Sequence, residues 1–246
     1  MLHTPILPPP LKLVELGTVG STNDHAKNLA KNGYPAWTAV WAHEQTQGRG
    51  RQGNVWSSLP GNLFMSVLLR PKTSAARIGQ LSFLCGVAVA NVLESFLPAG
   101  NAVHLKWPND VLLNGKKLAG ILLETEHQGV QTTPWVVAGI GVNITDAPAG
   151  AVSLRHVGVT SYDAGHLLEF ICTELYMLVK KWEKGGFQDI RQAWLSRAWK
   201  LGEPISARLP KETLTGTFEG LDQMGSLLLR MQDGSERMIV SGEVYI

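Results

Sequence analysis

The sequence predicts an α+β protein in two parts: a large one that mixes helices and strands, and a small barrel of short strands at the end. Three observations predict it. Helical and strand patterns follow one another irregularly up to about residue 201, short strands separated by turn residues begin at residue 203, and no internal repeat occurs. The 246 residues are enough for one large domain and one small domain.

The strands of the first part are predicted from apolar or alternating runs that are bounded by turn residues. In order, they are residues 13–16, 39–42, 62–70, 103–106, 111–113, 116–126 and 135–144. Asn114-Gly115, between the fifth and sixth runs, predicts a hairpin with a type I′ turn. Residues 45–62 are rich in Gly, Gln, Arg, Asn and Ser, and predict a long loop of the kind that usually carries function.

Four helices are predicted among and after these strands. The first follows the capping candidates at residues 21–24 and extends to about residue 31. The clearest amphipathic helix spans residues 75–97 and is ended by Pro98. Two more are expected at residues 163–184 and 187–200.

The end of the chain changes character. Short strands are expected at residues 204–209, 213–221, 226–231 and 236–240, a spacing typical of a small β-barrel. We therefore place a boundary near Leu201-Gly202, which divides the chain into residues 1–201 and 202–246. Because the link is short, we expect the barrel to pack beside the first domain.

Composition excludes several classes of protein. The 22 basic and 20 acidic residues give a net charge of +2, which offers no support for bulk nucleic-acid binding. The longest apolar run, residues 81–93, is too short and too interrupted to cross a bilayer, and the N-terminus lacks the basic region of a signal peptide. Cys85 and Cys172 form no CxxC pair, so we expect buried free thiols in a reducing compartment and a cytoplasmic protein.

Residues 48–53, Gly-Arg-Gly-Arg-Gln-Gly, match the dinucleotide-binding pattern G-x-G-x-x-G, but we reject the match. That pattern needs a following helix and an acidic residue about 20 positions on. Here no helix follows, and no acidic residue occurs between Glu44 and Glu94. The glycines let the backbone approach a ligand closely, and Arg49 and Arg51 suit a carboxylate or a phosphate. The segment predicts a loop that closes over an anion, with a solvated surface loop as the alternative.

Three further motifs are weaker when each stands alone. Lys106 and Asp110 flank a rigid proline after a strand, which suits a phosphate and a divalent cation, or else a turn with an incidental ion pair. On the second arm of the hairpin, either Lys116 or Lys117 can point into a site where Gly120 makes room for a ligand, or the arm is an edge strand protected by its lysines. Two glycines within residues 139–143 weaken the packing of a strand unless something lies against its backbone, or they mark a β-bulge or a tight contact between sheet and helix.

Taken together and in this order, the motifs are highly specific. The set consists of Ser21-Thr22-Asn23, Gln45 with residues 48–53 and Trp56, and then residues 106–110, 117–121 and 139–143. It closely resembles the biotin–protein ligase family over residues 13–144, and the tail is similar to the C-terminal domain of that family. The resemblance implies a class II aminoacyl-tRNA synthetase-like catalytic domain with a mixed sheet, followed by an SH3-like barrel.

The resemblance also implies an activity, that of an ATP-dependent, AMP-forming biotin–[biotin carboxyl-carrier protein] ligase that uses biotin, ATP and Mg²⁺. In such enzymes the biotin carboxylate attacks the α-phosphorus of ATP and gives biotinyl-5′-AMP. A lysine of the biotin carrier domain of a carboxylase, for example acetyl-CoA carboxylase, then attacks the mixed anhydride. Both substrates of the first step are anions, so cationic groups are needed to bring them together, and no side-chain nucleophile is required.

Roles for single residues follow from the same resemblance. Lys117, Arg49 and Arg51 are expected to be catalytic. The expected biotin-binding residues are Ser21, Thr22, Asn23, Gln45, Gly48, Arg49, Gly50, Arg51, Lys117, Gly120 and Gly139. Trp56, Lys106, Asn109 and Asn143 are expected to bind the nucleotide, and Asp110 is expected to bind the metal.

Two alternatives remain open. A lipoate–protein ligase shares the fold and the adenylate chemistry, although residues 48–53 and 106–110 favour biotin. A biotin-binding protein that does not adenylate is the non-enzymatic alternative, and Lys117, Arg49 and Arg51 argue against it.

The expected partners are limited. Only about a dozen residues precede the first strand, so we expect no N-terminal DNA-binding domain and no DNA partner. We expect no membrane partner either, and both a monomer and a homodimer fit the sequence. For the barrel we expect a role in holding the carrier protein, or ATP, in place, so that its loss impairs transfer more than adenylate synthesis. The alternative is that it only covers apolar surface, and then its loss destabilises the whole protein.

Overall fold

A seven-stranded mixed sheet forms the larger part of the computed structural model, which describes residues 3–126 and 135–245. Its strands are β1 (Lys12–Val19), β2 (Thr38–Gln45), β3 (Leu63–Leu69), β4 (Val103–Lys106), β5 (Asp110–Leu113), β6 (Lys116–Thr125) and β7 (Val136–Val142). They lie in the order β1-β2-β3-β7-β6-β5-β4, in which β1 and β2 are parallel and the other neighbours are antiparallel. The predicted α+β class with a mixed sheet is confirmed.

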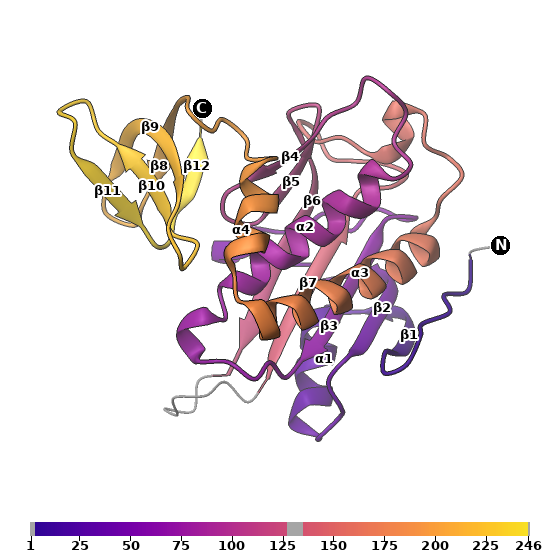
Figure 1. Cartoon of the computed structure of the whole chain (residues 1–246). Coiled ribbons are helices and arrows are strands. Elements are labelled where there is room, and N and C mark those ends of the chain that lie inside the picture. The colour runs from indigo at the N-terminus through magenta and orange to yellow at the C-terminus, as the bar shows by residue number, and fades with distance from the viewer. Residues whose placement is uncertain (1–2, 127–134, 246) are drawn as a thin grey trace.

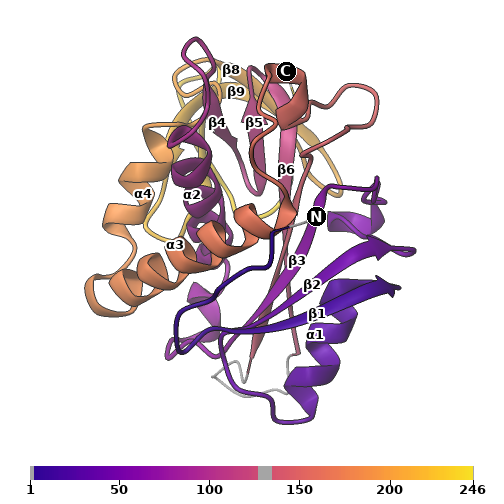
Figure 2. The same cartoon turned by 90° about the vertical axis from the view of Figure 1, so that its right-hand side faces the viewer.

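Helices cover both faces of this sheet, as Figures 1 and 2 show. Helices α2 (Gln80–Glu94), α3 (Ala164–Gly185) and α4 (Gln188–Leu195) lie on one side, and α1 (Thr22–Lys31) lies on the other. Because neighbouring residues of a strand face opposite ways, Trp41 joins the large apolar core under α2 and α3, while Val40 joins a small one under α1. The sheet is thus buried on both faces.

The helix predicted at residues 75–97 differs from expectation in length and character. A 3₁₀ turn occupies Ala75–Arg77, and α2 begins only at Gln80. Twelve of its 15 residues are buried, so it is not amphipathic, because the sheet, α3 and α4 all pack against it. Among the described residues, Ala75–Glu94 is the one helical stretch long and apolar enough to cross a membrane, but 72% of its apolar window is buried, as in a core helix.

Two other predictions concern turns and helix ends. The type I′ hairpin turn is confirmed, since Asn114 and Gly115 have φ angles of 52° and 77°. The helix expected to run to residue 200 ends at Leu195 instead. The reason is that the following residues pair with β4: Leu105 N donates to Arg197 O at 2.8 Å, and Trp199 N donates to Leu105 O at 2.9 Å.

The C-terminal strands form a separate five-stranded antiparallel sheet in the order β11-β10-β9-β8-β12. The strands are β8 (Pro204–Arg208), β9 (Thr213–Leu221), β10 (Leu227–Arg230), β11 (Glu236–Ile239) and β12 (Glu243–Tyr245). Four of them were predicted. The fifth, β12, was not, because three residues after Ser241-Gly242 are too few to show an alternating pattern.

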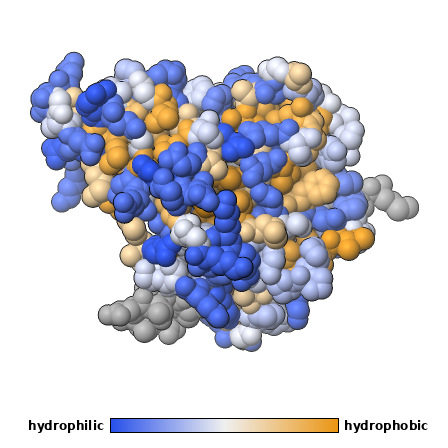
Figure 3. Space-filling view, viewed as in Figure 1, coloured by the Kyte–Doolittle hydropathy of each residue, from blue (hydrophilic) through white to orange (hydrophobic). Residues whose placement is uncertain are grey.

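The barrel packs on the first part, as predicted. Trp107 Nε1 donates to Gly225 O at 3.0 Å, and Arg191 Nε donates to Leu221 O at 2.7 Å. In Figure 3 the two parts form one continuous body with polar side chains spread over both. The division into residues 1–201 and 202–246 stays a prediction, and residues 1–2 and 246 lie outside the described part of the chain.

Candidate active site

One pocket collects nearly all of the residues that the sequence motifs single out. The N-terminal end of α1, the loop after β2, strands β3, β5, β6 and β7, and the terminal strand β12 all contribute to its walls. The predicted site residues that line it are Ser21, Thr22, Asn23, Gln45, Arg49, Gly50, Arg51, Trp56, Lys106, Asn109, Asp110, Lys117, Gly120 and Gly139. Segments far apart in the sequence thus meet in one place.

The pocket has a buried, neutral polar end next to the start of α1. Thr22 and Asn23 are each only 4% exposed. The Thr22 backbone N–H donates to Gln45 Oε1 at 2.9 Å, and Gln45 Nε2 donates to Ser58 Oγ at 3.3 Å. Apolar walls adjoin this end, formed by Phe64, Met65, Ile121, Leu122 and Ile140. Such a combination suits a mostly apolar molecule with one polar head.

The glycines of β6 and β7 make room for side chains of the protein itself. Gly120 and Gly141 are partners across the two strands, and Trp56 lies over both. A Cβ atom added at Gly141 would lie 2.5 Å from the Trp56 ring, and one added at Gly139 would lie 2.3 Å from Asn23 Oδ1. The close approach expected at these glycines is therefore present, and at Gly139 and Gly141 it serves Asn23 and Trp56.

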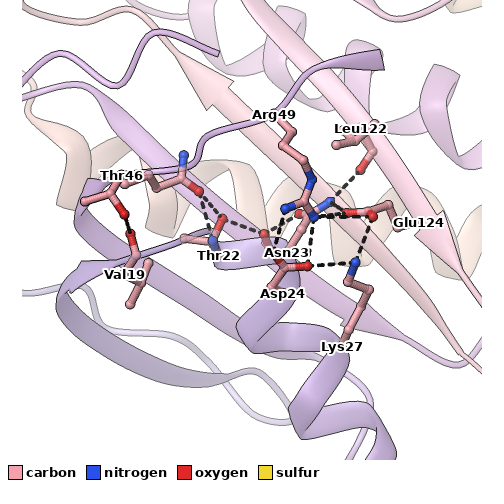
Figure 4. A network of polar contacts seen from close by, with 11 residues as sticks. Val19, Thr22, Asn23, Asp24, Lys27, Thr46, Arg49, Leu122 and Glu124 are labelled. Atoms are coloured by element: carbon pink, nitrogen blue, oxygen red, sulfur yellow. Dashed lines mark hydrogen bonds and ion pairs between the residues drawn. The ribbon is translucent and has the colours of Figure 1, made fainter. Parts of the chain in front are cut away.

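Arg49 is held by carboxylates at the edge of the pocket (Figure 4). Its guanidinium makes a bidentate contact with Asp24 at 2.5 and 2.8 Å, and Nη2 lies 3.2 Å from Glu124. Lys27 pairs with both carboxylates at 2.8 Å. The hydrogen bond from Arg49, followed by the contacts of Lys27, holds the pKa of Asp24 far below its usual value. The four charges balance, so Arg49 anchors the loop to α1 and β6.

Arg51 has a different environment, although it is only two residues away. Its Nη1 donates to two neutral acceptors, Asn109 Oδ1 and Gly242 O, each at 3.3 Å. Arg51 forms no direct ion pair with any residue in 3–126 or 135–245, and burial lowers its pKa by more than the nearby charges of Glu243 and Asp110 raise it. A cation that faces a pocket without a carboxylate in direct contact is suited to bind an anionic ligand.

Lys117 and Asp110 lie together near Arg51. Lys117 Nζ is 2.7 Å from Asp110 Oδ1, but not in line for a hydrogen bond, and it lies 5.7 Å from the centre of the Trp56 ring. Lys106 Nζ lies 5.7 Å from the ring centre of Tyr245 in β12. This end of the pocket therefore holds three cations, Arg51, Lys106 and Lys117, against two carboxylates, Asp110 and Glu243.

Two predicted site residues do not line the pocket. Gly48 lies just behind it, and a Cβ atom there would be 2.7 Å from Ser58 Oγ. Asn143 is 2% exposed, and its Nδ2 donates to Val152 O at 3.2 Å. In this arrangement Asn143 holds two segments of backbone together, and its nucleotide-binding role stays a prediction.

The sequence motifs missed several residues of the site. Asp24 and Glu124, which bind Arg49, lie in ordinary helix and strand sequence and carry no motif of their own. Glu243 and Tyr245 line the pocket from the unpredicted strand β12. Within the described part of the chain, no group of three or more His, Cys, Asp or Glu side chains is placed to hold a metal ion.

The fold and the pocket define a protein that binds a small molecule with a polar head, an apolar body and an anionic tail. Residues 17–143 match the biotin/lipoate A/B protein ligase family, and residues 200–246 match the biotin protein ligase C-terminal domain. The chain belongs to this family of ligases.

Individual relatives agree with this assignment. A biotin–[acetyl-CoA-carboxylase] ligase from Paracoccus denitrificans is 39% identical and aligns over 94% of this chain and 98% of its own length. The bifunctional ligase/repressor BirA of Bacillus subtilis is 34% identical over 92% of this chain and 71% of its own. The solved structure of an Aquifex aeolicus biotin protein ligase in complex with biotin and ATP is similar with a TM-score of 0.81, at 30% identity over 95% of this chain and 97% of that one.

Proposed function

We propose that this protein is a biotin–protein ligase, which converts biotin and ATP to biotinyl-5′-AMP and transfers biotin to a lysine of a carrier domain. The observation that carries the proposal is the single pocket with a neutral end at Thr22 and Gln45 and a cationic end at Arg51, Lys106 and Lys117. A cyclic urea fits the first end, and a carboxylate next to a triphosphate fits the second. The relatives named biotin ligases support the same conclusion.

The proposed first step joins two anions. A biotin carboxylate oxygen attacks the α-phosphorus of ATP, an O–P bond forms, and pyrophosphate leaves. Lys117 and Arg51 offset the negative charge at the reacting centre, and Lys106 is placed for the leaving phosphates. In the second step the lysine amine of the carrier attacks the biotinyl carbonyl carbon, loses a proton and releases AMP. Arg49, at the edge of the pocket, supports this site as the anchor of the loop.

Mg²⁺ fits the cationic end as a companion of ATP. Asp110 supplies one carboxylate and Asn109 one amide oxygen, and Mg²⁺ is commonly held by one or two carboxylates together with substrate phosphates and water. When bound, it neutralises phosphate charge. Asp110 also contacts Lys117. If Asp110 held the metal ion instead, Lys117 would be free to contact the substrates.

Biotin is favoured over lipoate because of the neutral end of the pocket. Buried Thr22 and half-buried Gln45 offer fixed hydrogen-bonding groups, and a ligand without polar atoms would leave part of their hydrogen-bonding capacity unused at a cost. Lipoate has a dithiolane ring with no N–H or carbonyl group to offer. A biotin-binding protein without activity is disfavoured, because it would not need the cations at the other end.

The proposal is tested by exchange of radiolabelled pyrophosphate into ATP. Exchange that depends on biotin and on Mg²⁺, and that lipoate does not support, is expected. Exchange with lipoate and not with biotin would make the protein a lipoate ligase, and binding of biotin without exchange would make it a non-catalytic binder.

The partners belong to the same proposal. The acceptor is the biotin carrier domain of a carboxylase, and the protein works in the cytoplasm as a monomer or homodimer without DNA or membrane partners. Gel filtration with light scattering tests the oligomeric state, and a gel-shift assay at physiological salt tests the absence of DNA binding.

A further inference from the structure

Glu124 lies outside the pocket but controls a side chain inside it (Figure 4). Glu124 Oε2 accepts a hydrogen bond from Asn23 Nδ2 at 2.7 Å, and Lys27 donates to Oε1 at 2.8 Å. Burial raises the pKa of Glu124. The hydrogen bonds from Lys27 and Asn23, together with the charges of Lys27 and Arg49, lower it by more than burial raises it, so the net shift is downward. Glu124 is therefore ionised at neutral pH, and an ionised carboxylate can only accept hydrogen bonds.

This carboxylate determines which way the Asn23 amide points. The Asn23 NH₂ group must face Glu124, and the amide oxygen then faces Ser66, whose hydroxyl lies 2.6 Å away. Asn23 also packs closely on β7, because its oxygen lies only 2.3 Å from where a Cβ atom of residue 139 would be. The amide is thus fixed by charge on one side and by packing on the other.

The orientation of Asn23 fixes the hydroxyl protons of Ser66 and Thr22 in turn. Three oxygen–oxygen contacts share these two protons: Ser66 to Asn23 at 2.6 Å, Ser66 to Thr22 at 2.7 Å, and Thr22 to Gln45 Oε1 at 3.1 Å. Asn23 Oδ1 can only accept, so the Ser66 proton points to it. The Thr22 proton then occupies the contact with Ser66, while Gln45 Oε1 is satisfied by the Thr22 backbone N–H.

The result is a defined polarity at the neutral end of the pocket. With its proton turned to Ser66, the Thr22 hydroxyl can only accept a hydrogen bond from a ligand. Gln45 Oε1 faces the Thr22 backbone, so its NH₂ group, with one proton for Ser58, has a second proton to donate. One acceptor beside one donor is the complement of an N–H beside a carbonyl group.

We propose that Glu124 is a positioning residue that sets the hydrogen-bond polarity of the biotin site: through Asn23 and Ser66 it fixes Thr22 as the acceptor of a ureido N–H. The inference rests on the proposed function, because it takes biotin as the ligand. Without Glu124, the Asn23 NH₂ group keeps only a long hydrogen bond to Leu122 O, at 3.4 Å, so the amide can turn over. Asn23 would then donate to Ser66, Ser66 would donate to Thr22, and Thr22 would meet the ligand as a donor.

The test measures selectivity, which a purely structural role would not change. Dissociation constants are measured by calorimetry for biotin and for its two cyclic carbamate analogues, in which one or the other ureido N–H is replaced by oxygen. The wild type is expected to reject the analogue that places an oxygen against Thr22. In Glu124→Ala the preference for biotin over that analogue should narrow by roughly tenfold or more.

Matched variants separate the relay from the ion pairs. Ser66→Ala cuts the relay and leaves every charge in place, so it should narrow the preference as well. Glu126→Gln removes a neighbouring carboxylate that pairs with Lys31 at 3.4 Å and lies outside the pocket, so it should keep the wild-type preference.

The outcomes are distinct. If Glu124→Ala and Ser66→Ala melt like the wild type and weaken biotin and the analogue by the same factor, Glu124 has no role in polarity and the inference is wrong. If Glu124→Ala does not fold, Ser66→Ala alone is used: a narrowed preference for biotin over the analogue supports the inference, and an unchanged preference contradicts it. If the wild type does not bind biotin at all, the proposed function itself fails.

Discussion

The two lysines that open β6 have neighbouring positions but different surroundings. Lys117 lies in the pocket beside Asp110 and Trp56, whereas Lys116 is exposed and does not line the pocket. Neighbouring residues of a strand face opposite sides, so Lys116 can serve as the control for substitutions of Lys117.

We predict that Lys117→Ala keeps the fold and loses adenylation. Loss of one cation at the reacting centre typically lowers the rate by ~10²-fold or more, equivalent to ~3 kcal/mol. Single-turnover formation of biotinyl-5′-AMP measures the effect, and Lys116→Ala should react at the wild-type rate. Near-normal adenylation by Lys117→Ala would remove this lysine from the reaction.

At the residue scale, the sequence predicted best those residues that belong to local motifs. Short sequence motifs identified four residues that line the pocket, because each is flanked by recognisable neighbours in the sequence: Asn23, Arg51, Asp110 and Lys117. Glu124 was not identified, since its role depends on β6 lying beside α1, which no local pattern shows. The same limit explains why Arg49 and Arg51 were treated alike, although only the first meets carboxylates.

At the scale of elements, the loop between β2 and β3 brings Arg49, Arg51 and Trp56 to the pocket. It is fixed at Arg49 by ion pairs with Asp24 and Glu124, but at Arg51 only by two hydrogen bonds of 3.3 Å to neutral acceptors. The Arg51 part therefore has the weaker attachment, and a bound anion would strengthen it.

We predict that biotin together with ATP slows tryptic cleavage after Arg51 sharply, because the adenylate supplies an anionic partner to this part of the loop. Cleavage is followed by mass spectrometry, with the exposed Lys211 in the turn between β8 and β9 as the internal reference. Equal protection at both positions would indicate general stabilisation, and no protection at Arg51 would contradict closure of the loop.

The anchor between the loop and α1 should depend on pH. The pKa of Asp24 is lowered, chiefly by its hydrogen bond with Arg49. A carboxyl with a lowered folded-state pKa stabilises the fold above its unfolded-state pKa of about 4, and this stabilisation is lost as the pH falls through the lower folded-state value. We predict that the melting temperature of the wild type falls more steeply below about pH 4 than that of Asp24→Asn. Parallel curves would show that the ion pair does not contribute.

The elements themselves were predicted where the pattern is local. The hairpin of β5 and β6 was predicted from its turn residues, and β4 from its short alternating run. The burial of α2 on all sides was not predicted, because it results from the tertiary packing of other elements around the helix. The end of α4 was also missed, since the pairing of Leu105 with residues 197–199 overrides the helical propensity there.

At the scale of the whole molecule, the terminal strand β12 joins the barrel to the active site. Glu243, Val244 and Tyr245 line the pocket, and Gly242 O accepts a hydrogen bond from Arg51. The sequence led us to expect that loss of the barrel impairs carrier transfer more than adenylate synthesis. The position of β12 revises that expectation, because its loss opens the pocket in which the adenylate is proposed to form.

We therefore predict that a chain ending at Ser241 loses adenylate synthesis and carrier biotinylation in equal proportion. Pyrophosphate exchange, transfer to the carrier and the melting temperature are measured on the same preparation. If exchange stays normal while transfer falls, the barrel acts on the carrier after all, and the wall formed by β12 does not matter for the first step.

The account as a whole is tested most directly by transfer of biotin itself. The protein is incubated with biotin, MgATP and a purified biotin carrier domain, and the carrier is probed with avidin and by mass spectrometry. The account predicts one biotin on the acceptor lysine of the carrier, dependent on ATP and absent when that lysine is replaced by arginine. A carrier that stays unmodified, although the folded protein binds biotin and ATP, would contradict it.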